Sequence, residues 1–213
     1  MGGAEAAPCR LALLLALDVS ASVDASEHDL QRDGLAAALN DADVRRAILL
    51  PGRGIVALAA FEWSGRYSQR ALINWTNLRS NAAIDRAIAA LVNAPRSREQ
   101  EPTALGYALG HGAGWLARGP DCARRVIDVS GDGVTNEGFG PQLAYKHFPF
   151  DGVVVNGLAV LGADSQVQRY YEENLRHGPG AFVETSQGYT GFQRAMTRKL
   201  YREINDLIVG TLE

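Results

Sequence analysis

Short segments that are apolar at almost every position recur along this chain, and segments with a helical pattern separate most of them. Strands of this kind are typical of parallel sheets, because helices cover both faces of such a sheet and leave no solvent-exposed side. The alternation therefore predicts an α/β fold: a doubly wound, mostly parallel six-stranded sheet with helices on both faces.

Two of the predicted strands are separated only by Ser64-Gly65, a hairpin signal, so we expect the second of them to be antiparallel and to lie at an edge. The pattern Ser26-Glu27-His28-Asp29 is typical of a capping box that opens the first helix. No internal repeat or linker interrupts the alternation, so we expect a single domain over residues 1–213. Strands are expected at 11–17, 54–63, 66–73, 124–130, 152–160 and 180–184, and helices at 26–40, 81–92, 103–117, 141–148, 165–175 and 191–207.

Composition narrows the classes of partner. The chain has 213 residues, 46% of them hydrophobic, which is enough for a large core, and its formal net charge is -3. This charge gives no broad attraction to nucleic acid, and the apolar run Leu11–Leu17 is too short to span a membrane. The ends Met1–Gly3 and Leu212–Glu213 look like added residues, so we expect any native export signal to be missing from this sequence.

Oxygen-bearing side chains follow two of the predicted strands at the point where each strand ends. The first strand runs into Asp18, Ser20 and Ser22, and the strand at 124–130 runs into Asp132 between two glycines. Ligands of doubly wound sheets bind outside the carboxyl ends of the strands, so these side chains are candidates for a site. Thr103, at the start of a predicted helix, is a fifth candidate.

Together these five residues form a set of hard oxygen donors without histidine or cysteine. Such a set suits Mg²⁺, Mn²⁺ or Ca²⁺ rather than zinc or copper, and we expect Mg²⁺. The four histidines, His28, His111, His147 and His177, are scattered without the spacing of metal ligands.

Three motifs carry a resemblance to a known family. Asp18-x-Ser20-x-Ser22, Thr103 in Thr-x-x-x-x-Ala-Leu, and Asp132 in Ser-Gly-Asp-Gly resemble the metal-ion-dependent adhesion site (MIDAS) of von Willebrand factor type A (VWA) domains. The likeness covers about 10–207, and the phrases "CRLALLLALDVSASVD" and "RRVIDVSGDGVTNEG" are similar in particular to an uncharacterised group of exported bacterial proteins in that superfamily.

The resemblance implies the strand order 3-2-1-4-5-6 and a divalent ion bound directly by Ser20, Ser22 and Thr103. Asp18 and Asp132 would act directly or through water. It also implies that an Asp or Glu of a protein partner fills the open coordination position.

The implied strand order makes the first and fourth strands neighbours and so bears on the two cysteines. Cys9 precedes Asp18 by about as many residues as Cys122 precedes Asp132. Parallel neighbours would bring both cysteines together at the opposite edge of the sheet, so we expect a Cys9–Cys122 disulfide. A disulfide would place the protein in an oxidising compartment, either the periplasm or the exterior.

Several residues near the motifs have more than one interpretation. Glu101-Pro102 replaces the small residues that often precede the threonine in the family, and Glu101 would either repel an acidic ligand or join the ion. Asp24 is expected to be a turn or cap residue rather than a ligand. For Asn136 and Glu137 we expect a polar turn, with an additional ion as the alternative.

Two functions remain open at the level of sequence. The first is a non-enzymatic, metal-dependent protein-binding module. The second is a magnesium-dependent phosphohydrolase, because an aspartate after the first strand of a doubly wound sheet also occurs in phosphotransfer sites. Against the second, the position two residues after Asp18 is Ser20 rather than a carboxylate, and neither Lys146 nor Lys199 is placed to bind a phosphate.

Overall fold

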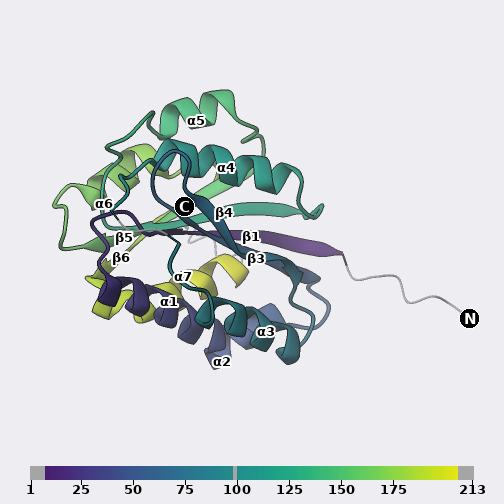
Figure 1. Cartoon of the computed structure of the whole chain (residues 1–213). Helices are drawn as coiled ribbons and strands as arrows, with labels where there is room; N and C mark the ends of the chain where they lie inside the picture. Colours follow the sequence, from purple (N-terminus) through teal and green to yellow (C-terminus); the bar gives the residue numbers. More distant parts are fainter. Residues whose placement is uncertain (1–7, 98–99, 206–213) are drawn as a thin grey trace, which may run out of the picture.

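A single six-stranded sheet forms the centre of the computed structural model, which describes residues 8–97 and 100–205 (Figure 1). Its strand order is β3-β2-β1-β4-β5-β6, with β3 antiparallel to β2 and the other neighbouring pairs parallel. This arrangement confirms the predicted fold class, strand order and antiparallel edge strand. The strands are β1 (Cys9–Asp18), β2 (Ile55–Trp63), β3 (Gln69–Asn77), β4 (Arg124–Gly131), β5 (Val153–Leu161) and β6 (Val183–Gln187).

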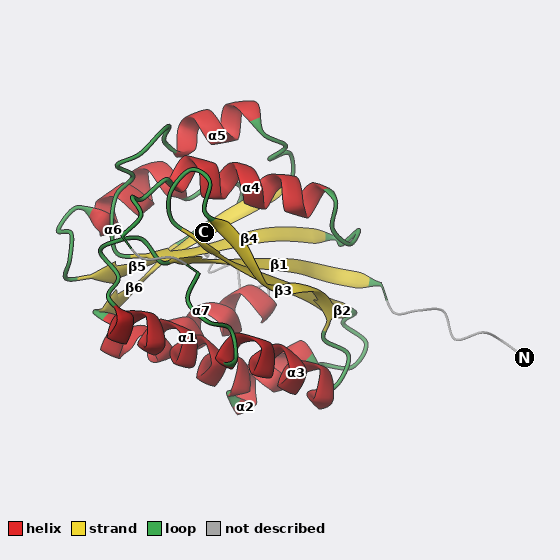
Figure 2. Cartoon of the chain, viewed as in Figure 1, coloured by secondary structure: helices red, strands yellow, loops and turns green. Residues whose placement is uncertain are grey.

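Helices cover both faces of the sheet (Figure 2). One face carries α4 (Leu105–Ala117), α5 (Pro141–His147) and α6 (Val167–Tyr170), the last of which continues into a π-helical turn, η1 (Tyr171–Leu175). The other face carries α1 (Ala25–Asn40), α2 (Ala42–Ile48), α3 (Asn81–Val92) and α7 (Phe192–Asn205), which follows a 3₁₀ turn, η2 (Tyr189–Gly191).

The central strand β1 explains why the layers form. Leu11, Leu13 and Leu15 face the helices α1, α2, α3 and α7, whereas Ala12 and Leu14 face α4 and η1. All five side chains are buried, because successive side chains of a strand point to opposite faces and helices cover both. A continuous apolar run is therefore what this position in the sheet requires.

The first helix begins differently from the sequence-based expectation. Its N-cap is Asp24, whose side chain accepts a hydrogen bond from the backbone of Glu27, while the Glu27 side chain accepts one from the backbone of Asp24. The expected capping box at Ser26 is wrong by two residues, because the Ser26 hydroxyl instead donates to Asp24. The interpretation of Asp24 as a cap residue is confirmed.

Several other elements differ from those predicted from the sequence. Helix α2 was not expected, strand β6 lies three residues later than predicted, and the predicted helix 165–175 is a single α-helical turn followed by η1. Helix α4 begins at Leu105, so Thr103 lies in the loop before it. Within the described residues, no helix is both long enough and apolar enough to cross a membrane.

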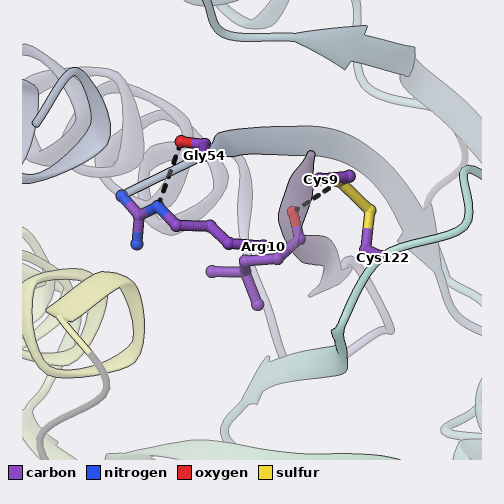
Figure 3. The surroundings of a disulfide bond; sticks show 5 residues. Cys9, Arg10, Gly54 and Cys122 are labelled. Atoms are coloured by element: carbon purple, nitrogen blue, oxygen red, sulfur yellow. Dashed lines mark hydrogen bonds between the residues drawn. A yellow bond between two sulfur atoms is a disulfide. The ribbon is translucent and has the colours of Figure 1, made fainter. Parts of the chain in front are cut away.

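A disulfide joins β1 to the segment before β4 at the end of the sheet opposite to Asp18 (Figure 3). Cys9 and Cys122 are bonded with their Cα atoms 4.5 Å apart, which confirms the predicted pair. The neighbouring Arg10 donates from Nε to the carbonyl of Gly54 at 3.3 Å and from its guanidinium to the carbonyls of Ala47 and Ile204. Disulfide and arginine together fix the start of β1 to its neighbours.

Candidate metal centre

The candidate site lies at the carboxyl ends of β1 and β4. Asp18 is the last residue of β1, and Asp132 directly follows β4. Because Leu17 pairs with Ser130 in the parallel register, the two strands end side by side. The chain continues from β1 to β2 and β3 on one side of the sheet, and β4, β5 and β6 lie on the other side. Ligands of open α/β sheets bind where the strand order reverses in this way.

The five predicted residues lie together here, and hydrogen bonds link all of them. The Ser22 hydroxyl donates to Asp132 Oδ1 at 2.6 Å, and the Ser20 and Ser22 hydroxyl oxygens are 3.3 Å apart. The Thr103 hydroxyl donates to Ser20 Oγ at 3.2 Å. Asp18 Oδ1 accepts from the backbone N–H of Ser20 at 2.8 Å. Three loops that are distant in sequence thus place five oxygen-bearing side chains at one point.

Two carboxylate oxygens at this point lack a partner among the described residues. They are Asp18 Oδ2 and Asp132 Oδ2, and both are buried. Burial, and then the negative charge of Asp132, raises the pKa of Asp18 to about 7. Burial likewise raises the pKa of Asp132, against the opposing effect of the Ser22 hydrogen bond. Two buried, close carboxylates with unused oxygens are what a bound cation would stabilise.

The five residues differ in their exposure to solvent. Ser22 is exposed, whereas Asp18, Ser20, Thr103 and Asp132 are buried. A ligand from solvent would therefore approach past Ser22. The candidate donors at this point are two carboxylates and three hydroxyls. Among the described residues, there is no cluster of three or more His, Cys, Asp or Glu side chains that could hold a metal.

The segment before α4 holds the loop after β1 in place. The Arg96 guanidinium donates to the carbonyls of Val19 and Val23, and the carbonyl of Glu101 accepts from the backbone N–H of Ala21 at 2.8 Å. The positive charge of Arg96 also opposes the rise in the pKa of Asp18. The conformation of the Asp18–Ser22 loop thus depends on a segment some 75 residues away in sequence.

Asn136 positions Thr103. Its side-chain oxygen accepts from the backbone N–H of Thr103 at 2.8 Å, while the backbone N–H groups of Asn136 and Glu137 donate to the Thr103 carbonyl. Glu137 in turn pairs with Arg66, with 2.9 Å between Oε1 and Nε. This polar turn therefore acts as a clamp on Thr103, a role that its sequence did not reveal.

Gln31 is a second residue that the sequence did not single out. It lies buried on α1, donates from Nε2 to the carbonyl of Asp18 at 2.8 Å, and accepts from the Ser130 hydroxyl at 3.0 Å. One amide thus ties α1 to the ends of β1 and β4. A lone glutamine on a helix that is otherwise partly apolar carries no recognisable signal, which is why sequence reasoning missed it.

A buried pair of polar side chains, Glu62 and His28, supports the same region from β2 and α1. Glu62 lies 2.8 Å from His28 Nε2 on α1 and accepts from the backbone N–H of Ser97 at 3.0 Å. Burial alone would raise the pKa of Glu62, but the hydrogen bonds from His28 and Ser97 outweigh it and lower that pKa. His28 is therefore a core residue.

Gly131 leaves room for the site. A Cβ at this position would lie 2.7 Å from Asp18 Oδ2 and 2.7 Å from the hydroxyl oxygen of Tyr171, well inside contact distance. The Tyr171 hydroxyl is itself buried and has no hydrogen-bond partner among the described residues. Glycine is thus required where β4 passes the Asp18 carboxylate.

Comparison with known proteins agrees with this architecture. The family described as "Protein of unknown function (DUF1194)" matches residues 8–208. Comparison with curated protein sequences finds no match.

Solved structures with the same fold come from several sources. Proximal thread matrix protein 1 from the mussel byssus, in a form with a zinc-occupied MIDAS motif, is 14% identical with a TM-score of 0.64, over 95% of this chain and 50% of that chain. The pilus adhesin SpaC from Lactobacillus rhamnosus GG is 14% identical with a TM-score of 0.67, over 94% of this chain and 32% of that chain.

A von Willebrand factor type A protein from Catenulispora acidiphila is 13% identical with a TM-score of 0.60, over 92% of this chain and 42% of that chain. The chain thus spans about half or less of the length of these structures. At such identities they establish the fold alone. The chain therefore belongs to the DUF1194 family, and its fold is that of a VWA domain.

Proposed function

We propose that Asp18, Ser20, Ser22, Thr103 and Asp132 bind a divalent cation and that the domain is a non-enzymatic module that binds a protein partner through it. The observation that carries the proposal is the pair of buried, unpartnered oxygens, Asp18 Oδ2 and Asp132 Oδ2, beside three linked hydroxyls. These hard oxygen donors favour Mg²⁺, with Mn²⁺ and Ca²⁺ as alternatives.

The donor set also favours recognition of a carboxylate. Two aspartates neutralise a doubly charged ion, while neutral hydroxyls leave it able to attract a further negative ligand. An Asp or Glu side chain of the partner would complete the coordination from the open side, past Ser22. The mussel byssus protein, whose MIDAS holds zinc, and the pilus adhesin give this proposal support by analogy of fold.

The phosphohydrolase alternative receives no comparable support. Lys146 lies on α5, and Lys199 is buried in the core beside Asp128, so neither of the chain's two lysines adjoins the site. A hydrolase of phosphate esters needs groups that bind the phosphate and move a proton. We expect no turnover of generic phosphate esters with Mg²⁺ above that of the Asp18→Ala variant.

The disulfide is relevant to the compartment in which the domain functions. A Cys9–Cys122 bond persists in oxidising surroundings, and thiols are kept reduced in the cytosol of most organisms. We therefore propose that the domain functions in the periplasm or outside the cell.

The ion site is tested by calorimetric titration of Mg²⁺, Mn²⁺ and Ca²⁺ into chelator-treated protein. Saturable binding that is lost in Asp18→Ala and Ser20→Ala supports the site. A matched control is Asp33→Asn, which removes an exposed carboxylate on α1 and should leave binding unchanged. Equal binding by Asp18→Ala and the wild type would overturn the assignment.

The open coordination position has its own test. Water-proton relaxation reports water bound to Mn²⁺ in the loaded protein. N-acetyl-aspartate amide should lower the relaxation rate by displacing that water, whereas the matched N-acetyl-asparagine amide should not. An equal response to both compounds, or to neither, would contradict recognition of a carboxylate by the ion.

A further inference from the structure

A polar cluster lies in the core between the sheet and α7, apart from the candidate metal centre. Lys199 of α7 is fully buried, and its Nζ lies 2.6 Å from Asp128 Oδ1 of β4 and 2.7 Å from Glu203 Oε1 of α7. Asp128 and Glu203 are 1% and 2% exposed. The ring of Phe182 adjoins these groups, with its centroid 5.2 Å from Lys199 Nζ. The amine and the two carboxyl groups are thus shielded from solvent.

The charges in this cluster do not balance as an ordinary ion pair. One lysine faces two carboxyl groups, and the cost of burying an unpaired charge keeps one carboxyl neutral. Burial, and then the charge of Glu203, raises the pKa of Asp128 to about 8. Asn156 of β5 donates from Nδ2 to Glu203 Oε1 at 2.7 Å. Burial and the neighbouring charge of Glu203 thus favour the neutral form of Asp128.

Lys199 and Asp128 are in close contact, at ion-pair distance. Lys199 Nζ lies 2.6 Å from Oδ1 of Asp128. The nitrogen is therefore no more than one C–O bond length farther from the carboxyl carbon Cγ. A nucleophile, an electrophilic carbon and a proton carrier lie together at van der Waals distance, as a near-attack arrangement requires.

We propose that Lys199 and Asp128 condense to an intramolecular amide bond, with Glu203 as the proton carrier. The Glu203 carboxylate accepts a proton from the Lys199 ammonium, and the neutral amine attacks Cγ of the protonated Asp128 carboxyl. Glu203 then passes this proton to the leaving hydroxyl, which departs as water, and takes up the second proton from the nitrogen, so that Glu203 ends as the neutral acid. The N–C bond forms, one C–O bond breaks, and one water leaves; no oxidant or other reagent is needed.

Two physical effects drive the condensation. Holding the reacting groups in contact replaces a bimolecular encounter, an advantage that reaches effective concentrations of about 10⁵ M or more. The product also removes a buried ammonium and a buried acid and leaves a neutral amide, which costs less to keep away from water. The bond would fix α7 covalently to β4, the strand that leads to Asp132.

Intact mass under denaturing and reducing conditions tests the proposal on the unmodified chain. A mass lower than that of the sequence by one water supports it. The full sequence mass, unchanged after prolonged incubation of the folded protein, would overturn it, and Lys199 and Asp128 would then form an ion pair only.

Peptide mapping locates the lost water. Trypsin does not cleave after an acylated lysine, so the bond predicts that peptide 126–146 remains joined to peptide 199–202. A cyclic imide at Asp132-Gly133 or Asp151-Gly152 would also lose water, but it would leave the two peptides separate and would overturn the proposal.

Variants separate the roles of the three residues. Lys199→Met keeps the volume of the side chain and should restore the full mass, as a bond to this amine requires. Glu203→Gln should slow formation of the bond strongly, whereas the matched control Lys146→Arg should not change it. Water loss in Glu203→Gln at the wild-type rate would overturn the role of Glu203 as proton carrier.

Discussion

The hydroxyl of Ser22 donates to Asp132 Oδ1 at 2.6 Å and so joins the loop after β1 to the loop after β4. Ser22 is an exposed residue, whereas Asp132, which it contacts, is buried. This bond connects the exposed and the buried parts of the candidate metal centre. It also leaves Asp132 Oδ2 without a partner among the described residues and hence available to a cation.

The stability of the metal-free protein should depend on the charge of Asp18. Burial, and then the charge of Asp132, raises the pKa of Asp18 from 3.8 to about 7, so the folded chain holds this proton more tightly than the unfolded chain. The free energy of unfolding therefore falls as the pH rises between these two values and stays low above the higher one. Asp18→Asn should remove a cost of up to about 4 kcal/mol at pH 8 and much less at pH 5.

Urea unfolding in the presence of a chelator measures this difference. The variant and the wild type are compared at both pH values, so that the titration of other groups cancels. A stabilisation by Asp18→Asn that is equal at pH 5 and pH 8 would show that the carboxyl group does not titrate between them in the folded state.

Metal affinity should rise with pH over the same interval. A cation competes with the proton on Asp18, so its apparent affinity should increase up to about pH 7, where the raised pKa lies, and level off above it. Titration of Mn²⁺ at a series of pH values checks this. If the Mn²⁺ affinity did not change between pH 5 and pH 8, the ion would not be displacing a proton from Asp18.

Asn136 should affect the ion through Thr103. Asn136→Ala leaves the backbone N–H of Thr103 without its acceptor and frees the turn that holds the threonine, so we expect metal affinity to fall about 10- to 100-fold. Glu137→Gln is the matched control in the same turn, because the Glu137 side chain contacts Arg66 and not Thr103. Equal losses in both variants would indicate a general disturbance of the loop.

The disulfide should contribute to stability and not to metal binding. Replacing Cys9 and Cys122 together by serine releases a long loop and should lower the free energy of unfolding by on the order of 4 kcal/mol in the chain-entropy model. The bond lies at the opposite end of the sheet from Asp18, so the metal affinity of the folded variant should equal that of the wild type. Calorimetric titration and urea unfolding of the same variant measure both quantities.

The sequence predicts the strands that are buried on both faces of the sheet. Strands β1 and β4 are covered on both faces, so their apolar runs are visible directly. The residues after them form recognisable motifs, and the matched distances from Cys9 to Asp18 and from Cys122 to Asp132 follow from parallel neighbours.

Features that depend on tertiary contacts were missed or misplaced. Helix α2 has seven residues, too few for a clear helical period, and is set by the side chain of Asp41, which accepts from two backbone N–H groups. The roles of Gln31 and Asn136 consist of hydrogen bonds to groups that are distant in sequence. Such bonds leave no local pattern in a sequence.

The location of a bound ion tests the central claim most directly. Crystals grown with Mn²⁺ would be measured at a wavelength where manganese scatters anomalously. We predict a single strong peak within coordination distance, about 2.2 Å, of the Ser20 and Ser22 hydroxyls, with Asp18 and Asp132 bound directly or through water. A strong peak at any other group, or no peak from protein that has been saturated with Mn²⁺, would contradict the assignment of this site.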